Sequence, residues 1–130
     1  MQTVTKIGSA CREIGFLCIT GTGIDVERID SLRKAVIALF DVPDADKQAG
    51  AITRDNYRGF IPLGFFTPND GTGTTDLYEA YKLHWECPAG DPVADRCALY
   101  GPNRWPPQIP ALRDAVLEYW SALDRINDAL

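Results

Sequence analysis

Few residues in this sequence have side chains that could bind a metal ion or act as a nucleophile. His84, in the stretch KLHWE, is the one histidine, and there are four cysteines. No two cysteines form a C-x-x-C pair, and a single histidine adds little, so a structural zinc site is not expected. His84 could be a ligand, but a histidine without partner ligands is more typical of a strand or surface residue. The sequence therefore predicts no catalytic and no metal-binding residue.

The stretch NYRGFIPLG, residues 56–64, contains the best candidates for a substrate contact. Gly59 allows a close backbone approach or an unusual dihedral angle, and Pro62 stiffens the chain. These features would hold Tyr57 and Arg58 pointing into a cleft, so both are predicted as substrate-binding residues. The structural alternative is that Arg58 pairs with a nearby carboxylate on a turn. The sequence leaves both interpretations open.

Composition and charge exclude several classes of protein. With 45% hydrophobic and 24% charged residues, the 130 positions are typical of one soluble globular domain. The net charge of −5, with basic residues scattered among acidic ones, opposes binding to nucleic acid. Apolar stretches such as 36–40 are too short to cross a membrane, and the signal-peptide pattern is missing. We expect a cytoplasmic protein with free thiols, in which Cys11 and Cys18 are buried.

The spacing of apolar residues predicts the elements of the first half of the chain. A helical pattern covers residues 4–14, and the apolar run 16–19 between glycines predicts a buried strand. A second helix is expected over residues 26–40, with the side chain of Asp25 capping its first N–H groups. One or two further helical turns follow over residues 44–50.

The second half of the chain is predicted to consist of loops and short strands before a long helix. Residues 52–101 lack helical periodicity, except for a weak pattern at 77–81. In the stretch LYGPNRWPP, residues 99–107, the prolines exclude helix and Trp105 provides an apolar anchor for the loop. Beyond Pro110 the strongest helical pattern of the sequence runs to the last residue. Its apolar face comprises Leu112, Val116, Tyr119, Leu123, Ile126 and Leu130.

Four stretches occur in an order that resembles a known family. They are ACREIGFLCITGTGI, NYRGFIPLG, DLYEAYKLH, and LYGPNRWPP followed by LRDAVLEYW. Together they resemble the N-terminal region of the isopenicillin N synthase-like, 2-oxoglutarate- and Fe(II)-dependent oxygenases, over nearly the whole chain. The resemblance implies an α/β fold of helices with a few short strands. In the family this region packs against a double-stranded β-helix, or jelly roll, and that barrel is absent from this chain.

The resemblance also implies a function for residues 1–130. They would form the N-terminal module of an oxygenase that oxidises a small organic substrate with O₂. Fe(II) and 2-oxoglutarate are implied for the full-length parent, and the C-terminal jelly-roll domain is the implied partner. In the family the segment that matches Tyr57 and Arg58 lies near the mouth of the active site, where it can contact the substrate.

Departures from the family pattern change what this chain can do. The family usually has histidine in place of Thr22 and an additional strand before the first helix, so we expect a chain truncated at both ends. Non-haem iron of this type needs two histidines and one carboxylate as ligands. His84 is the one histidine of the sequence. The chain by itself is therefore predicted to be inactive and to hold no cofactor. The alternative is a non-catalytic interaction module that docks on a separate partner chain.

Overall fold

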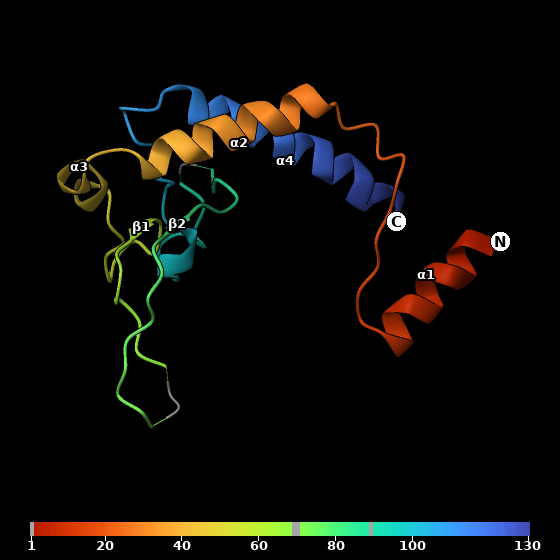
Figure 1. Cartoon of the computed structure of the whole chain (residues 1–130), viewed down its shortest axis with the longest axis horizontal. Helices are drawn as coiled ribbons and strands as arrows, with labels where there is room; N and C mark the ends of the chain where they lie inside the picture. The colour runs from red at the N-terminus through yellow and green to blue at the C-terminus, as the bar shows by residue number, and fades with distance from the viewer. Residues whose placement is uncertain (1, 69–70, 89) are drawn as a thin grey trace.

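The computed structural model describes residues 2–68, 71–88 and 90–130 of the chain. In chain order the elements are α1 (Gln2–Glu13), α2 (Val26–Phe40), α3 (Asp44–Ala49), β1 (Gly59–Ile61), β2 (Ala80–Lys82), a short 3-10 helix (Ala98–Tyr100) and α4 (Ala111–Ala129). Figure 1 shows α2 and α4 side by side. The two strands and their long loops extend from one end of this pair, and α1 stands apart near the other end.

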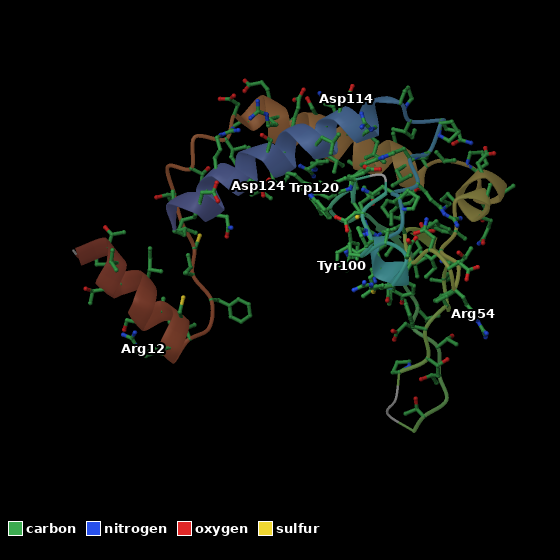
Figure 2. The ribbon with its side chains drawn as sticks, turned by 180° about the vertical axis from the view of Figure 1, so that it is seen from behind. Arg12, Arg54, Tyr100, Asp114, Trp120 and Asp124 are labelled. Carbon is green, nitrogen blue, oxygen red and sulfur yellow. The ribbon has the colours of Figure 1, made fainter. Side chains whose placement is uncertain are left out.

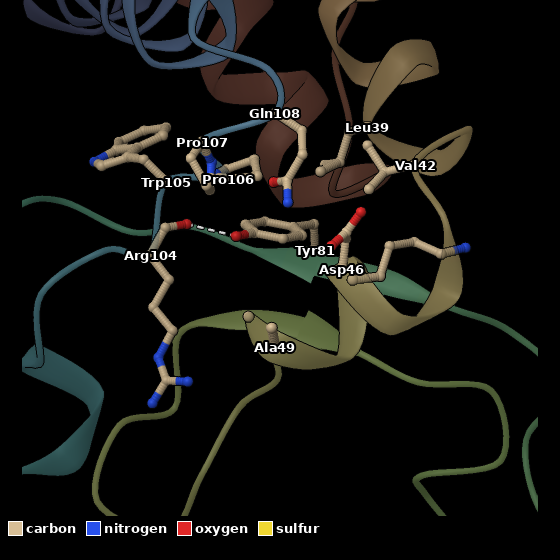
Figure 3. Close-up of a pocket in the computed structure, with 12 residues that line it drawn as sticks. Leu39, Val42, Asp46, Ala49, Tyr81, Arg104, Trp105, Pro106, Pro107 and Gln108 are labelled. Carbon is tan, nitrogen blue, oxygen red and sulfur yellow. Dashed lines mark hydrogen bonds between the residues drawn. The ribbon is translucent and has the colours of Figure 1, made fainter.

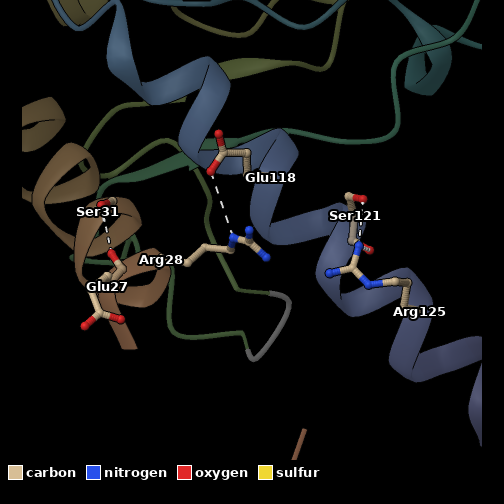
Figure 4. Close-up of polar contacts among 6 residues, drawn as sticks. All are labelled: Glu27, Arg28, Ser31, Glu118, Ser121 and Arg125. Atoms are coloured by element: carbon tan, nitrogen blue, oxygen red, sulfur yellow. Dashed lines mark hydrogen bonds and ion pairs between the residues drawn. The ribbon is translucent and has the colours of Figure 1, made fainter. Parts of the chain in front are cut away.

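The core forms where α2 meets α4. Ala35 and Leu39 of α2 are buried against Leu112 and Val116 of α4, and Trp105 packs beside them. Burial of the Leu and Val side chains among these contributes roughly 1.5–3 kcal/mol each to folding. The ion pair that joins the two helices at the surface (Figure 4) has an N–O distance of 3.9 Å between Arg28 and Glu118. Exposed pairs of this kind contribute about 0–1 kcal/mol, so apolar packing holds the helices together.

The two strands form an antiparallel pair in which Phe60 faces Tyr81 across the ladder. Phe60 also exchanges backbone hydrogen bonds with the chain after α3, because its N–H donates to Gly50 and its carbonyl accepts from Ile52, both at 2.9 Å. At Gly59, φ is +113° and an added Cβ would lie 2.1 Å from the carbonyl oxygen of Gly50. The predicted close approach at Gly59 is therefore confirmed, and no residue with a side chain fits there without movement.

The helices lie where the sequence predicts them. The bounds of α2 agree with the prediction, α1 and α3 differ by one or two residues, and α4 begins directly after Pro110. The short strands and long loops predicted between residues 52 and 101 are confirmed. Asp25 is the N-cap of α2, but its side chain makes no capping hydrogen bond. Only its carbonyl oxygen accepts bonds, from the N–H groups of Arg28 and Ile29.

Three local predictions are wrong, and the first is the side-chain cap expected from Asp25, which does not form. Residues 16–19 form no strand and are exposed, since no strand of the described residues lies beside them to pair with their backbone. The weak periodicity at 77–81 forms no helix: the chain pairs there as β2, in agreement with the short strands expected in this region. Cys11 and Cys18 are exposed, since they lie on α1 and on the unpaired segment rather than in the core.

The apolar face of α4 is covered only in part. Leu112 and Val116 are buried against α2, whereas Leu123 and Leu130 are 38% and 61% exposed. The smaller Ala122 is buried in the second half of the helix. Among the described residues, no helix is long and apolar enough to cross a membrane.

Candidate functional site around Arg58

Arg58 lies immediately before β1, and its side chain points inward. Only 1% of its surface is exposed. Its Nε donates to the carbonyl oxygen of Leu99 at 2.9 Å, and Nη2 donates to the same oxygen. Nη1 donates to the carbonyl oxygen of Trp85 at 3.2 Å and to Oδ1 of Asn103 at 3.0 Å. The guanidinium therefore connects β1 with two loops that are distant in the sequence.

Asn103 is the second centre of this network. Its Oδ1 accepts a hydrogen bond from the backbone N–H of His84 at 3.0 Å, and its Nδ2 donates to the carbonyl oxygen of the same residue at 2.7 Å. The side-chain amide thus pairs with His84 in the way that a neighbouring strand would. Nδ2 also donates to Glu86 at 3.2 Å. Because Oδ1 is shared with Arg58, one amide fixes the loop, the end of β2 and the arginine together.

The residues after Asn103 fasten the same loop at further points. Nη1 of Arg104 donates to the carbonyl oxygen of Ala51 at 2.6 Å, and the Arg104 carbonyl accepts the hydroxyl proton of Tyr81 at 2.5 Å. Nε1 of Trp105 donates to Glu86 at 3.3 Å. The sequence predicts a rigid loop anchored by Trp105. In the structure, hydrogen bonds hold this loop in addition to its apolar anchor and its prolines.

A cavity of about 300 Å³ lies beside the buried guanidinium. Its lining residues are Arg58, His84, Trp85, Leu99 and Tyr100. Trp85 is 58% exposed and Tyr100 39%, so two aromatic side chains border an opening to solvent; Figure 2 labels Tyr100, which lies beside the loops at the strand end of the molecule. An opening with aromatic walls and a few polar groups is the usual form of a small-molecule site.

Burial and nearby charges keep His84 neutral to a lower pH than a free imidazole in water. Burial lowers the pKa of His84 below its usual value of 6.5, and the positive charges of Arg58 and Lys82 lower it further. Burial likewise lowers the pKa of Arg58, an effect opposed by the negative charge of Glu86. A neutral imidazole can accept or donate one hydrogen bond to a bound molecule.

The second predicted substrate residue, Tyr57, is not part of the lining of this cavity. Its ring lies 3.8 Å from Nζ of Lys82, which is a cation–π contact, and meets the edge of Phe66 at 6.5 Å between centroids. The structure thus gives Tyr57 and Arg58 different surroundings, although they are adjacent in the chain. That either residue contacts a substrate stays a prediction.

The residues present do not fit an iron site. Among the described residues there is no group of three or more His, Cys, Asp or Glu side chains that could hold a metal ion. The sequence contains one histidine, whereas the facial triad of this iron chemistry requires two. No chemical step through iron can therefore be assigned to side chains of this chain.

Asn103 and Glu86 are central to the site, yet no sequence motif predicts them. Asn103 does stand between prolines at positions 102 and 106, and a polar amide in a stiffened loop is a signal for a structural hydrogen bond. Glu86 has no comparable signal, because it accepts bonds from residues 17 and 19 positions further along the chain. Only the folded chain brings these donors to it.

Comparisons with known proteins agree with this architecture. Residues 1–108 match the family model described as non-haem dioxygenase in morphine synthesis N-terminal. The chain is 32% identical over 128 residues to validamycin A dioxygenase of Streptomyces hygroscopicus subsp. limoneus. The matched region covers 95% of this chain and 34% of the relative. It is 29% identical over 131 residues to the 2-oxoglutarate-dependent dioxygenase thnC of Trichoderma harzianum, covering 99% of this chain and 39% of the relative.

A solved structure shows the same arrangement of elements. A 2OG-Fe(II) oxygenase family protein from Caulobacter crescentus superimposes with a TM-score of 0.80 and 27% sequence identity, over 97% of this chain and 40% of that protein. The chain therefore spans about a third of the length of the curated relatives it matches. Relatives such as thnC are 2-oxoglutarate-dependent dioxygenases. The family match agrees with the order of motifs and with the helix pair and its short strands. The chain therefore belongs to the non-haem dioxygenase N-terminal family.

Proposed function

We propose that this chain is the N-terminal part of an Fe(II)- and 2-oxoglutarate-dependent oxygenase that oxidises a small organic substrate with O₂. The proposal rests on the names of the relatives and on the share of their length that the chain spans. In this proposal the iron and 2-oxoglutarate are held by a C-terminal jelly-roll domain. The residues described above border that domain and supply neither ligand.

The structural observation that supports packing against a further domain is an apolar surface that no described residue covers. On α1 and the segment after it, Val4 is 73% exposed, Ile14 71% and Phe16 84%. Residues 16–19 have the sequence of a strand, but no strand of the described residues pairs with them. Large apolar patches mark interaction surfaces. We infer that α1 and residues 16–19 pack against the jelly-roll domain and that residues 16–19 pair with it as a strand.

The cavity beside Arg58 is the part of this chain proposed to approach the substrate. Its aromatic border and the neutral His84 suit a small organic molecule with an apolar body. Arg58 has three acceptors of its own, so we propose that it acts on the substrate mainly by fixing the positions of Trp85 and Leu99. Tyr57, with Lys82 over its ring, is proposed to contact the substrate from the adjacent face.

A separate partner chain is the competing explanation for the same exposed surface. Reading the coding sequence that follows Leu130 distinguishes the two. An H-x-D motif, a distant histidine and an R-x-S motif in the same frame support the oxygenase. A stop codon directly after Leu130, with none of these motifs, would favour the interaction module.

The activity itself is tested on both forms of the protein. The longer protein, loaded with Fe(II) under anaerobic conditions and then given O₂, should convert 2-oxoglutarate to succinate. Residues 1–130 alone should bind no stoichiometric Fe(II) and should form no succinate, because the chain has one histidine. One tightly bound iron per 130-residue chain, with the spectroscopic signature of two histidine ligands, would overturn this assignment.

A further inference from the structure

The cavity beside Arg58 contains a buried positive charge that no acidic side chain of the described residues pairs with. Arg58 is 1% exposed, and its acceptors are the carbonyl oxygens of Leu99 and Trp85 and the amide oxygen of Asn103, all of them uncharged. None of the ion pairs within the described ranges involves Arg58. A buried charge without a counter-ion is costly, so an anion that comes close to it is stabilised.

Neighbouring charges add to this positive potential. Lys82, the last residue of β2, forms no ion pair with the part of the chain that the structure describes. Its charge and that of Arg58 both lower the pKa of His84. Glu86 is the acid whose charge acts on Arg58, but two donors already engage its carboxylate and it does not line the cavity. The cavity is therefore a positive region in a chain whose net charge is −5.

The side chains at the opening suit an anion with an aromatic body. Trp85 is 58% exposed, Leu99 46% and Tyr100 39%, so apolar surface lies open beside the buried charge. The imidazole of His84, the indole of Trp85 and the hydroxyl of Tyr100 can each donate a hydrogen bond. No acidic side chain of the described residues lines the cavity. A planar ring can stack on the aromatic side chains while a carboxylate faces the donors.

The walls of the cavity are fixed before a ligand arrives. Asn103 pairs with both backbone polar groups of His84, and the guanidinium of Arg58 holds the carbonyls of two further lining residues. At the next position of the loop, the carbonyl oxygen of Arg104 accepts a hydrogen bond from the Tyr81 hydroxyl, drawn as a dashed line in Figure 3. A site with preformed walls loses less conformational freedom on binding, which favours affinity for a small rigid ligand.

We propose that the cavity beside Arg58 binds a small aromatic carboxylate. The carboxylate accepts hydrogen bonds from the His84 imidazole and the Tyr100 hydroxyl in the field of Arg58. Its ring lies against Trp85 and Leu99. At about 300 Å³ the cavity is at the lower end of the range for small-molecule sites, which limits the ligand to about one ring. That this carboxylate is the substrate of an oxygenase rests on the proposed function, whereas its binding does not.

Sodium phenylacetate is the probe for this proposal, titrated into the purified protein near neutral pH. The ring C–H resonance of His84 should shift and saturate at millimolar probe. At saturating phenylacetate the titration midpoint of His84 should rise, because a bound carboxylate offsets the two positive charges that lower it. Phenylacetamide has nearly the same shape without the charge and should bind about tenfold or more weakly.

Two pairs of variants locate the binding site. Trp85→Ala should weaken phenylacetate binding about tenfold through the lost aromatic contact. Tyr78→Ala is its control, because Tyr78 is 45% exposed and does not line this cavity. Lys82→Gln should weaken binding about threefold through the lost charge. Lys34→Gln, on the exposed face of α2, should leave the affinity unchanged.

The proposal is overturned if phenylacetate does not saturate, if phenylacetamide binds equally well, if the His84 midpoint does not rise, or if Trp85→Ala binds as tightly as the unchanged protein. The succinate assay on the longer protein tests the oxygenase separately. Succinate formation without phenylacetate binding would reject the carboxylate site and keep the oxygenase. Saturable phenylacetate binding without succinate formation would keep the carboxylate site and reject the oxygenase.

Discussion

Arg58 is a single side chain that joins segments lying 27 to 45 residues away in the chain. Replacing it by alanine removes the donor from two partly buried carbonyls, those of Leu99 and Trp85, and from the buried Oδ1 of Asn103. We expect Arg58→Ala to lower the free energy of unfolding by about 3 kcal/mol, since each unsatisfied buried polar group costs about 1–3 kcal/mol. Urea unfolding measures this loss. Arg54→Ala is the control, because Arg54 is exposed on the neighbouring loop (Figure 2).

Arg58→Lys extends this test to the shape of the guanidinium. An ammonium keeps the charge but loses the planar fork that reaches both loops, so it should restore only part of the lost stability. In an active longer protein, loss of melting temperature with an unchanged kcat/KM would assign Arg58 a purely structural role. If Arg58→Ala melts like Arg54→Ala, the network described here does not stabilise the fold.

His84 provides a direct measurement of the electrostatics of its cavity. Because it is the one histidine of the sequence, its ring C–H resonance can be followed by NMR without assignment. We expect a titration midpoint below 6.5, since burial and the nearby positive charges oppose protonation. Lys82→Gln should move the midpoint upward, whereas Lys34→Gln on the exposed face of α2 should not. A midpoint at or above 6.5 in the unchanged protein would contradict the burial of this imidazole.

The same shift has a consequence for stability. The unfolded chain takes up a proton on His84 near pH 6.5, while the folded chain resists protonation until lower pH. The contribution of neutral His84 to the free energy of unfolding is therefore complete above the pKa that His84 has in the unfolded chain. It is lost as the pH falls from that value through the lower pKa of the folded chain.

At the scale of elements, the junction of β1 with the end of α3 depends on Gly59. A Cβ at this position would meet the Gly50 carbonyl oxygen at 2.1 Å, and the backbone has φ of +113°. Gly59→Ala should therefore cost more than about 2 kcal/mol of stability, from backbone strain together with the clash. The matched control is Gly73→Ala, at φ of +70° with no atom within 4 Å, where strain of about 1 kcal/mol acts alone.

Thermal and urea unfolding of the two glycine variants measure this difference. Equal destabilisation of Gly59→Ala and Gly73→Ala would show that the close approach of the two backbones adds nothing. In that case the bridge between Phe60 and the residues after α3 would not fix the position of the sheet. A larger loss at Gly59 supports the role of this contact in placing Arg58, its direct neighbour.

At the scale of the whole molecule, 130 residues bury a core at one helix pair and leave much apolar surface open. We expect residues 1–130 in isolation to form oligomers that grow with concentration and to bind a hydrophobic dye. Light scattering and dye fluorescence measure both effects. Phe16→Ser with Leu17→Ser should reduce them, because these side chains are 84% and 40% exposed. The control pair Thr3→Ser with Thr5→Ser changes little apolar surface on α1, the helix that precedes these two residues.

A monomeric chain that melts in one sharp transition and binds no dye would contradict this prediction. It would mean that residues 14–19 need no cover in solution. It would also remove the observation that carries the proposed packing against a jelly-roll domain. The succinate assay on the longer protein would then decide the proposed function alone.

The local elements of this protein follow from its sequence, because helix formation depends on residues three and four positions apart. The apolar periodicity predicts α2 and α4, and the prolines around Trp105 predict an extended loop before α4. The order of four short motifs was enough to indicate the family that the comparisons show. The sequence likewise determines that one histidine cannot complete a triad of two histidines and a carboxylate.

Only the tertiary structure decided where Arg58 points and what residues 16–19 do. The sequence predicts that Arg58 either faces a cleft or pairs with a carboxylate. In the structure it lines a cavity, and its hydrogen-bond partners are two backbone carbonyls and the amide of Asn103. A strand needs a neighbour to accept its hydrogen bonds, and the described residues provide none for 16–19. Both outcomes depend on groups distant in the sequence, whose approach is determined by packing of the whole chain and not by local spacing.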